Sequence, residues 1–360
     1  MSPATSHQPQ ATVSDLSEAE LVARIQHHLP PSPDWLLVGI GDDAAVVEPE
    51  RNRVEVLSID ALVEGVHFDR AFVPPDAIGH RALAVNLSDL AAMGAAPRLA
   101  LLSLVLPPAL PLGDFDAIAA GFAALAARHR LHVAGGNLTR SPGPLMIDVM
   151  VLGTVKRRQA LTRSGARPGD ELYVSGTIGA AAAGLRMLQE RLALSTTEDT
   201  GNAASASSAS PVVESCVERY LRPEPRVRLG VMLSRNRAAS ACVDLSDGLA
   251  DAAHRLAEAS GVGLTIDAEA LPIGAGARAF FDARGRDAVT EAMTGGDDYE
   301  LLLAVRPRAH RRLSAAARHG GATLTRVGRC TDDPAVTLQR SAGGAVIDTV
   351  PLPQGYSHFR

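Results

Sequence analysis

The sequence has few cysteines, few aromatic residues and a single lysine, and each shortage excludes a class of protein. Its three cysteines, Cys216, Cys242 and Cys330, are far apart and form no CxxC pair, which argues against a disulfide scaffold or a zinc site. Lys156 is the only lysine, and the glycine pattern of a P-loop does not precede it. A formal net charge of -5 over 360 residues gives no basic footprint for nucleic acid.

The chain also lacks a segment suited to a membrane or to secretion. Its longest apolar stretch, residues 99–112, is interrupted by three prolines and is too short to span a bilayer. The polar first ten residues do not have the pattern of a signal peptide. We therefore expect a cytoplasmic protein with no membrane partner and a disordered N-terminus over residues 1–15.

What is present is an alternation of apolar runs and helical patterns, which predicts two α/β domains. The first spans residues 16–155 and includes a helix over 76–93, ended by Gly94 and Pro97. In the same domain a short strand over 132–134 is expected to end in residues 135–140, where two glycines suit a close approach of the backbone to a ligand or a tight turn equally well. The second domain spans residues 156–360, with a flexible Ser/Ala/Thr/Gly-rich insertion over 195–210.

One acid stands out because it lies among alanines and leucines. Asp89 shares a face of the predicted helix with Asn86 and Met93, and a carboxylate there is costly unless it is hydrogen-bonded, paired or solvated. A solvated helix face is the simplest interpretation. The Leu-Ser-Asp sequence that ends at Asp89 recurs at Asp247, however, with Asp244 before it. This repetition directs attention to further acids in similar settings.

Five acids lie at loop starts, at strand ends or in apolar helices: Asp43, Asp60, Asp89, Asp244 and Asp247. Motifs of other chemistries, HExxH, GxSxG and GxGxxG, are absent from the sequence. If these acids converge, each close pair costs about 4 kcal/mol at an effective dielectric constant of about 20, so a cation is required. All-oxygen ligands suit magnesium bound to phosphate groups. The convergence itself is assumed at this stage.

Taken together and in order, seven motifs closely resemble those of the thiamine-monophosphate kinase family, and the match runs from about residue 16 to residue 359. They are Gly39–Ala45, Ser58–Phe68, Ala84–Ala95, Leu161–Ala166, Asp244–Leu249, Gly296–Leu301 and Gly355–Phe359.

The resemblance implies a fold and a reaction. The fold is that of the aminoimidazole-ribonucleotide-synthetase-like superfamily: two α/β domains, of which the N-terminal one has a mixed sheet that pairs with a second copy in a homodimer. The reaction moves the terminal phosphate of ATP onto thiamine monophosphate to give thiamine diphosphate, the last step of thiamine diphosphate biosynthesis. Transfer is expected to be direct and in line, assisted by several magnesium ions, without a covalent nucleophile on the enzyme.

The motif positions also imply roles for individual residues. The implied magnesium ligands are Asp43, Ser58, Ile59 through its backbone carbonyl, Asp60, Asp89, Asn137, Asp244 and Asp247. The implied ATP contacts are Gly136, Asn137, Arg163 and Ser246. The implied contacts to thiamine monophosphate are His67, Glu300 and Tyr356, with Glu300 suited to face the cationic thiazolium ring. Asn137 stands where the family commonly has aspartate, which implies that one magnesium ion binds more weakly.

Two other functions remain open at the level of the sequence. One is a related enzyme that activates an amide or carboxamide oxygen with ATP. The other is a regulatory protein that binds ATP or metal without catalysis, for which Asn137 is the only support. The motifs around His67, Glu300 and Tyr356 favour thiamine monophosphate. Asp297 and Asp298 are explained equally well as turn residues.

Overall fold

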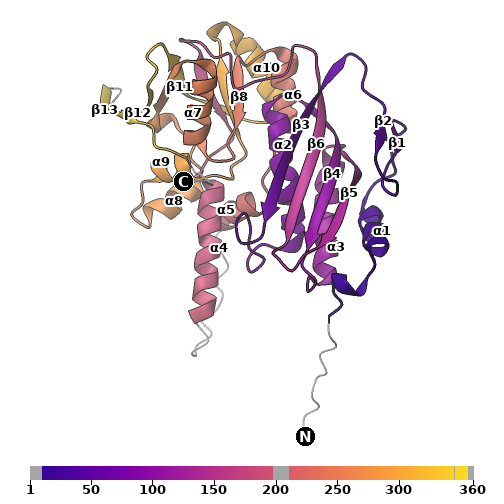
Figure 1. The fold of residues 1–360 in the computed structure, drawn as a ribbon. Helices are drawn as coiled ribbons and strands as arrows, with labels where there is room; N and C mark the ends of the chain where they lie inside the picture. Colours follow the sequence, from indigo (N-terminus) through magenta and orange to yellow (C-terminus); the bar gives the residue numbers. More distant parts are fainter. Residues whose placement is uncertain (1–9, 198–210, 344, 356–360) are drawn as a thin grey trace. The chain divides into compact units, whose positions relative to one another are not determined.

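The computed structural model describes residues 10–197, 211–343 and 345–355 (Figure 1). Contacts divide the chain into two compact units. Unit 1 comprises Met1–Pro49, Ile59–Leu83 and Leu99–Met150, and unit 2 comprises Glu50–Ser58, Ala84–Arg98 and Val151–Arg360. Four elements contribute residues to both units: β3 (Arg53–Val63), α2 (Pro75–Ala92), β4 (Ala96–Leu106) and β6 (Met146–Lys156).

A four-stranded sheet has the order β3-β6-β4-β5, and within unit 1 strands β4 and β5 are parallel. Helix α3 connects these two strands along the chain, as a parallel pair requires. Helix α1 begins at a capping box, in which the Ser17 backbone N–H donates to the Glu20 carboxylate (2.8 Å). The other elements of unit 1 are η1 (Val13–Asp15), α1 (Glu18–His28), β1 (Leu36–Val38), β2 (Val46–Val47), α3 (Leu112–Arg128) and β5 (His132–Arg140).

The expected end of the strand at residue 134 is wrong, because residues 135–140 continue strand β5, which also excludes the alternative of a tight turn there. Gly136 pairs with Leu102 of β4, and a Cβ atom built on Gly136 would lie 1.8 Å from the Leu102 carbonyl oxygen. Gly136 is therefore explained by the close approach of two strands rather than by a turn.

Helix α2 confirms the helix predicted over residues 76–93. It begins at Pro75, whose fixed φ suits a first helical position, and ends where Gly94 adopts a positive φ of 67°. The Ala95 N–H donates to the Leu90 carbonyl (2.8 Å), which closes the helix end. Its side chains are almost all buried, and Asp89 is the exception in the last two turns.

Unit 2 is built on a seven-stranded sheet with the order β13-β12-β9-β11-β7-β10-β8, in which β12 and β9 are parallel. Its other elements are β7 (Glu171–Ser175), α4 (Ala180–Thr197), α5 (Pro211–Leu221), α6 (Val227–Asn236), β8 (Ala241–Asp244), α7 (Leu249–Ser260), β9 (Gly263–Asp267), η2 (Ala268–Ala270), α8 (Ala275–Asp282), α9 (Ala288–Thr294), β10 (Leu301–Val305), η3 (Pro307–Ala309), α10 (His310–Gly320), β11 (Leu324–Thr331), β12 (Val336–Ala342) and β13 (Ala345–Pro351).

The insertion predicted over residues 195–210 lies mostly outside the described residues. Its first three residues, 195–197, are the end of helix α4.

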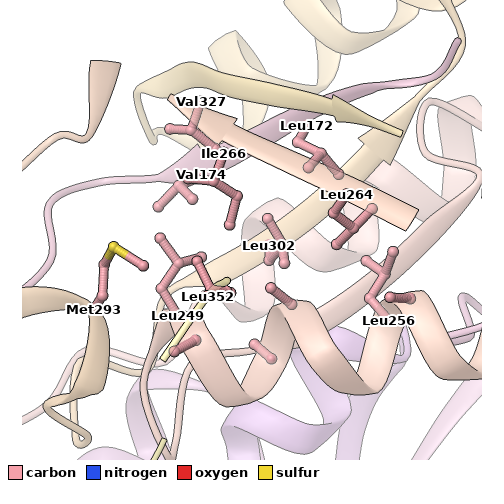
Figure 2. Packing of buried hydrophobic residues seen from close by; sticks show 14 of the residues in the cluster. Leu172, Val174, Leu249, Leu256, Leu264, Ile266, Met293, Leu302, Val327 and Leu352 are labelled. Carbon is pink, nitrogen blue, oxygen red and sulfur yellow. The ribbon is translucent and has the colours of Figure 1, made fainter. Parts of the chain in front are cut away.

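The main core of unit 2 lies between this sheet and helix α7. Leu172, Leu264 and Leu302 project from three strands toward Leu249 and Leu256 of the helix (Figure 2). All five side chains are at most 1% exposed, and burying a leucine contributes about 1.5–3 kcal/mol. This packing fixes the ends of β8 and β10, from which the candidate site is built.

Among the described helices, none combines the length and apolar character that crossing a membrane would need.

Candidate functional site

Two of the predicted acids lie close together in unit 2. Asp89 is in the last turns of α2, and Asp244 is the final residue of β8. The Ser88 hydroxyl donates to the Asp244 carboxylate (2.8 Å), and the Ser58 hydroxyl on β3 donates to the Asp89 carboxylate. Three segments that are distant in the sequence therefore bring two carboxylates and two hydroxyl groups together.

The negative charge of Asp89 acts on the buried carboxylate of Asp244. Burial and, to a smaller extent, the negative charge of Asp89 raise the pKa of Asp244 to about 6, against the opposing effects of the Ser88 hydrogen bond and the Arg163 guanidinium. Asp244 is 5% exposed, so water does little to screen this repulsion. A nearby cation would relieve it. The solvated helix face considered for Asp89 is therefore an incomplete description, because Asp89 is only partly exposed and is hydrogen-bonded.

The donor set fits magnesium. Magnesium is typically held by one or two carboxylates, with water and phosphate oxygens completing its shell, and Asp89, Asp244 and Ser58 offer oxygen ligands only. No group of three or more His, Cys, Asp or Glu side chains arranged to hold a metal occurs in the part of the chain that the structure describes. Two carboxylates with oxygen neighbours suit an ion whose remaining ligands are water and phosphate oxygens.

The loop after β8 carries the other two predicted residues of this motif. The Asp297 N–H donates to the Ser246 carbonyl (2.8 Å), which ties the loop to the segment before β10. Asp247 lies just before helix α7 and forms an ion pair with Arg255 (3.3 Å). Arg163 is exposed, and its carbonyl accepts a hydrogen bond from the Ser260 hydroxyl (3.0 Å).

Unit 1 contains the remaining described candidates. Asp43 is exposed in the turn between β1 and β2, where its N–H donates to the Asp42 carboxylate (2.8 Å). Ile59 is 62% exposed on β3, and Asp60 follows it with an exposed side chain. Ser58, which binds Asp89, directly precedes these two residues on the same strand.

Three further candidates belong to loops and strands of unit 1. The His67 Nδ1 accepts the Val63 N–H (3.1 Å), which fixes the orientation of the ring. Gly136 and Asn137 are exposed on β5, and the Asn137 amide donates to the Thr139 hydroxyl (2.8 Å). Tyr356 lies outside the described residues.

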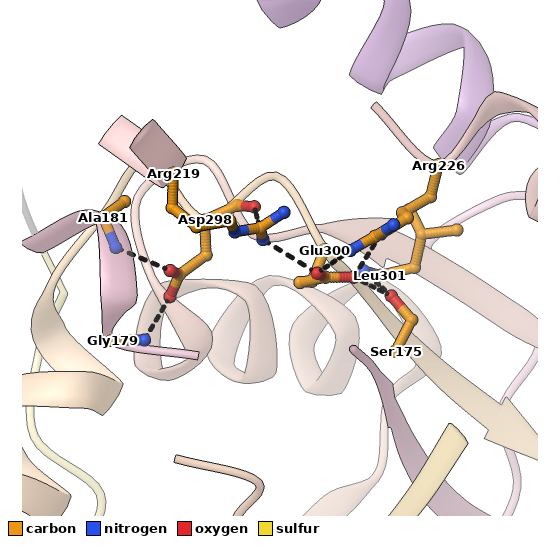
Figure 3. A network of polar contacts seen from close by, with 8 residues as sticks. All are labelled: Ser175, Gly179, Ala181, Arg219, Arg226, Asp298, Glu300 and Leu301. Carbon is orange, nitrogen blue, oxygen red and sulfur yellow. Dashed lines mark hydrogen bonds and ion pairs between the residues drawn. The ribbon is translucent and has the colours of Figure 1, made fainter. Parts of the chain in front are cut away.

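In the Gly-Asp-Asp-Tyr-Glu motif, the sequence did not decide whether Asp298 is a turn residue, and the structure shows that it caps a helix. Asp298 is 1% exposed, and its carboxylate accepts the N–H groups of Gly179 (2.7 Å) and Ala181 (3.3 Å) at the start of α4 (Figure 3). Burial raises the pKa of Asp298 to about 7, while the Gly179 N–H and the Arg219 charge lower it. Asp298 is therefore a helix-capping residue and not a surface turn residue.

Glu300 lies at the centre of an ion-pair network that the sequence did not suggest (Figure 3). Its carboxylate accepts hydrogen bonds from Arg219 Nη2 (2.8 Å), Arg226 Nε (2.6 Å) and the Ser175 hydroxyl (2.6 Å). Glu300 is 0% exposed, so this arrangement leaves its carboxylate no surface for a direct contact with a ligand. The two arginines lie 81 and 74 residues away along the chain, and no local motif marks them. The one signal in the sequence for a buried, paired Glu300 was its position directly before a wholly apolar strand in a domain rich in arginine.

Comparisons with known proteins agree with the motifs. Residues 41–155 match the family model of the AIR synthase related protein, N-terminal domain, and residues 167–341 match that of its C-terminal domain. The chain is 36% identical over 348 residues to the thiamine-monophosphate kinase of Escherichia coli K12. The aligned region covers 95% of this chain and 98% of that protein.

Solved structures show the same likeness. The crystal structure of thiamine-monophosphate kinase from Stenotrophomonas maltophilia K279a superposes with a TM-score of 0.77 at 39% identity, covering 94% of this chain and 100% of that one. The structure of AaThiL complexed with AMPPCP and TMP has a TM-score of 0.71 at 30% identity, covering 98% and 100% respectively.

Proposed function

The chain belongs to the thiamine-monophosphate kinase family, and we propose that it transfers the terminal phosphate of ATP directly onto thiamine monophosphate with the help of magnesium. An oxygen of the thiamine monophosphate phosphate forms a bond to the γ-phosphorus, and the bond between that phosphorus and the β,γ-bridging oxygen breaks. The products are thiamine diphosphate and ADP. The observation that carries the proposal is the Asp89–Asp244 pair, since two close carboxylates suit a metal ion that binds phosphate.

Asp89, Asp244 and Ser58 are the residues we assign to magnesium first. Magnesium would supply neutralisation of phosphate charge, which is the main requirement of phosphoryl transfer. The Ser88 hydroxyl orients the Asp244 carboxylate, and the Ser58 hydroxyl orients that of Asp89. The further ligands proposed from the motifs are Asp43, Ile59 through its carbonyl, Asp60, Asn137 and Asp247.

We assign the ATP contacts to exposed groups of the motifs. Arg163 is the cation suited to phosphate oxygens, because its side chain is exposed and its charge already acts on Asp244. Ser246 is proposed to contact ATP from the loop after β8, and Gly136 and Asn137 from strand β5.

For thiamine monophosphate, His67 and Tyr356 remain the proposed contacts. We propose a positioning role for Glu300, whose backbone carbonyl accepts the Leu245 N–H (2.8 Å) while its carboxylate is held by the two arginines. Glu300 thereby anchors the loop that carries Ser246 and Asp247.

We further propose a cytoplasmic homodimer with a domain boundary near residue 155. The family models support the boundary, since one ends at residue 155 and the next begins at residue 167. The three cysteines support a reducing compartment, since all are free and buried. The dimer rests on the resemblance of the motifs.

The proposal is tested by incubating the purified chain with ATP, thiamine monophosphate and magnesium chloride and measuring thiamine diphosphate. Unphosphorylated thiamine is the matched control, because it lacks the accepting phosphate and should give no diphosphate. Nucleotide binding without thiamine diphosphate would favour a regulatory protein. ADP formation that depends on an amide or carboxamide substrate would favour the related amide-activating enzyme.

A further inference from the structure

A cavity of about 310 Å³ lies in unit 2, and neither Asp89 nor Asp244 lines it. Its walls come from the start of β3, the turn between α2 and β4, the end of β6 with the turn that follows, and the last turns of α6. We call it the connector cavity and define it by Arg53, Thr154, Lys156, Gln159, Ser234 and Arg235. Its volume is at the lower end of the range of small-molecule sites, about 300–1,000 Å³.

The connector cavity is positively charged. Three cations line it, namely Arg53, Lys156 and Arg235, and no acid does. The Arg53 charge is compensated by an ion pair with Glu50, which also accepts the Thr154 hydroxyl (2.6 Å). Among the described residues, Lys156 and Arg235 have no ion-pair partner. The lining therefore carries about two uncompensated positive charges.

The backbone around these two cations is fixed by hydrogen bonds. The Gln159 N–H donates to the Lys156 carbonyl (3.0 Å), which closes the turn after β6. The Ser234 hydroxyl donates to the Gln159 carbonyl (2.9 Å), which ties that turn to α6 beside Arg235. The turn that carries Lys156 and the helix that carries Arg235 are thus linked by hydrogen bonds, and both residues line the same cavity.

We propose that the connector cavity binds a phosphate-type dianion. A phosphate group carries about -1.5 to -2 charges at neutral pH, which matches the two uncompensated cations. The Gln159 side-chain amide supplies a neutral donor to the same ligand. The nucleotide contacts proposed above, Arg163 and Ser246, do not line this cavity, so the inference does not rest on the proposed function.

The test is calorimetric titration of the nucleotide-free full chain with inorganic phosphate at constant ionic strength. Lys156→Gln and Arg235→Gln should each weaken binding by about tenfold or more, because each removes a charge-assisted contact. Arg228→Gln is the matched control, since Arg228 is exposed on the same helix and lies outside the cavity lining. The Arg228→Gln variant should change the affinity for inorganic phosphate by less than about twofold.

A parallel titration of Arg163→Gln separates this cavity from the proposed nucleotide site, and binding of phosphate should survive in that variant. A titration with AMP identifies the source of the phosphate group. If Lys156→Gln weakens the binding of both AMP and inorganic phosphate, the cavity takes a nucleotide phosphate. If it weakens the binding of inorganic phosphate alone, the cavity takes the free ion. Binding that is insensitive to Lys156 and Arg235, or equally sensitive to Arg228, would overturn the proposal.

Discussion

Replacing Glu300 by glutamine removes one negative charge from the buried network in unit 2. Glutamine has nearly the same shape, but its amide group presents hydrogens to donors that the carboxylate now satisfies. Arg219, Arg226 and the Ser175 hydroxyl would then share a single carbonyl oxygen. Two guanidinium groups would be left without their counterion.

The structure allows the cost to be worked out. Breaking a buried ion pair costs about 3–5 kcal/mol, because the remaining charge is uncompensated. The Glu300 side chain is 0% exposed, but each arginine side chain is 20% exposed and keeps some water. We therefore expect a loss at the lower end of that range, about 3 kcal/mol.

A surface pair provides the control. Glu190 pairs with Arg284, and their side chains are 47% and 39% exposed. Glu190→Gln should cost about 0–1 kcal/mol, as exposed ion pairs do. Both variants are measured by urea unfolding, with equal m-values required for the comparison. A loss below about 1 kcal/mol for Glu300→Gln, or one equal to that of the control, would refute the reasoning.

The same variant distinguishes positioning from direct contact with the substrate. If the Glu300 carboxylate touched thiamine monophosphate, the main effect would be a higher KM for that substrate with little change in the free energy of unfolding. The buried network predicts the reverse: the free energy of unfolding should fall strongly, and any change in KM or kcat should come together with that loss of stability.

Three other substitutions test the acids and their neighbours. Asp89→Asn should lower turnover at limiting magnesium by at least about tenfold, since it removes half of the charge that the pair offers a cation; unchanged turnover would misplace the centre. Asn137→Asp should reach full activity at a lower magnesium concentration than the natural chain, and equal magnesium dependence would contradict this. Burial raises the pKa of Asp298 to about 7, so the folded chain retains a proton that the unfolded chain loses near pH 4, and stability falls as pH rises between these values. Asp298→Asn should flatten that slope by up to about 1.4 kcal/mol per pH unit in unfolding experiments; an unaltered slope would show that Asp298 is ionised throughout.

The local elements of unit 2 were predictable where an apolar run ends at turn residues. Strands Glu171–Ser175, Gly263–Asp267 and Leu301–Val305 coincide with apolar runs that are flanked by polar or turn-forming residues. The continuation of β5 through Gly136 was missed because glycine signals a turn and a close strand pair equally well. The order of seven strands depends on long-range pairing that no local pattern encodes.

The candidate site was predictable to a similar extent. The repeated Leu-Ser-Asp sequence directed attention to Asp89 and Asp244, but their proximity became visible only in the folded chain. The partners of Glu300 were not predictable, because an arginine that compensates a buried acid resembles any surface arginine in the sequence. The motif around Glu300 indicated a functional residue, and the structure adds the ion pairs that hold it.

The hydrogen bond between Ser88 and Asp244 spans 156 residues of chain, and this has a consequence for folding during synthesis. Contacts of such sequence separation form late, since the intervening chain must first be ordered. A nascent chain still attached to the ribosome cannot assemble the acidic pair until β8 has emerged and docked. Magnesium affinity at this pair would therefore report completion of folding, and a ligand that binds only the finished fold also stabilises it.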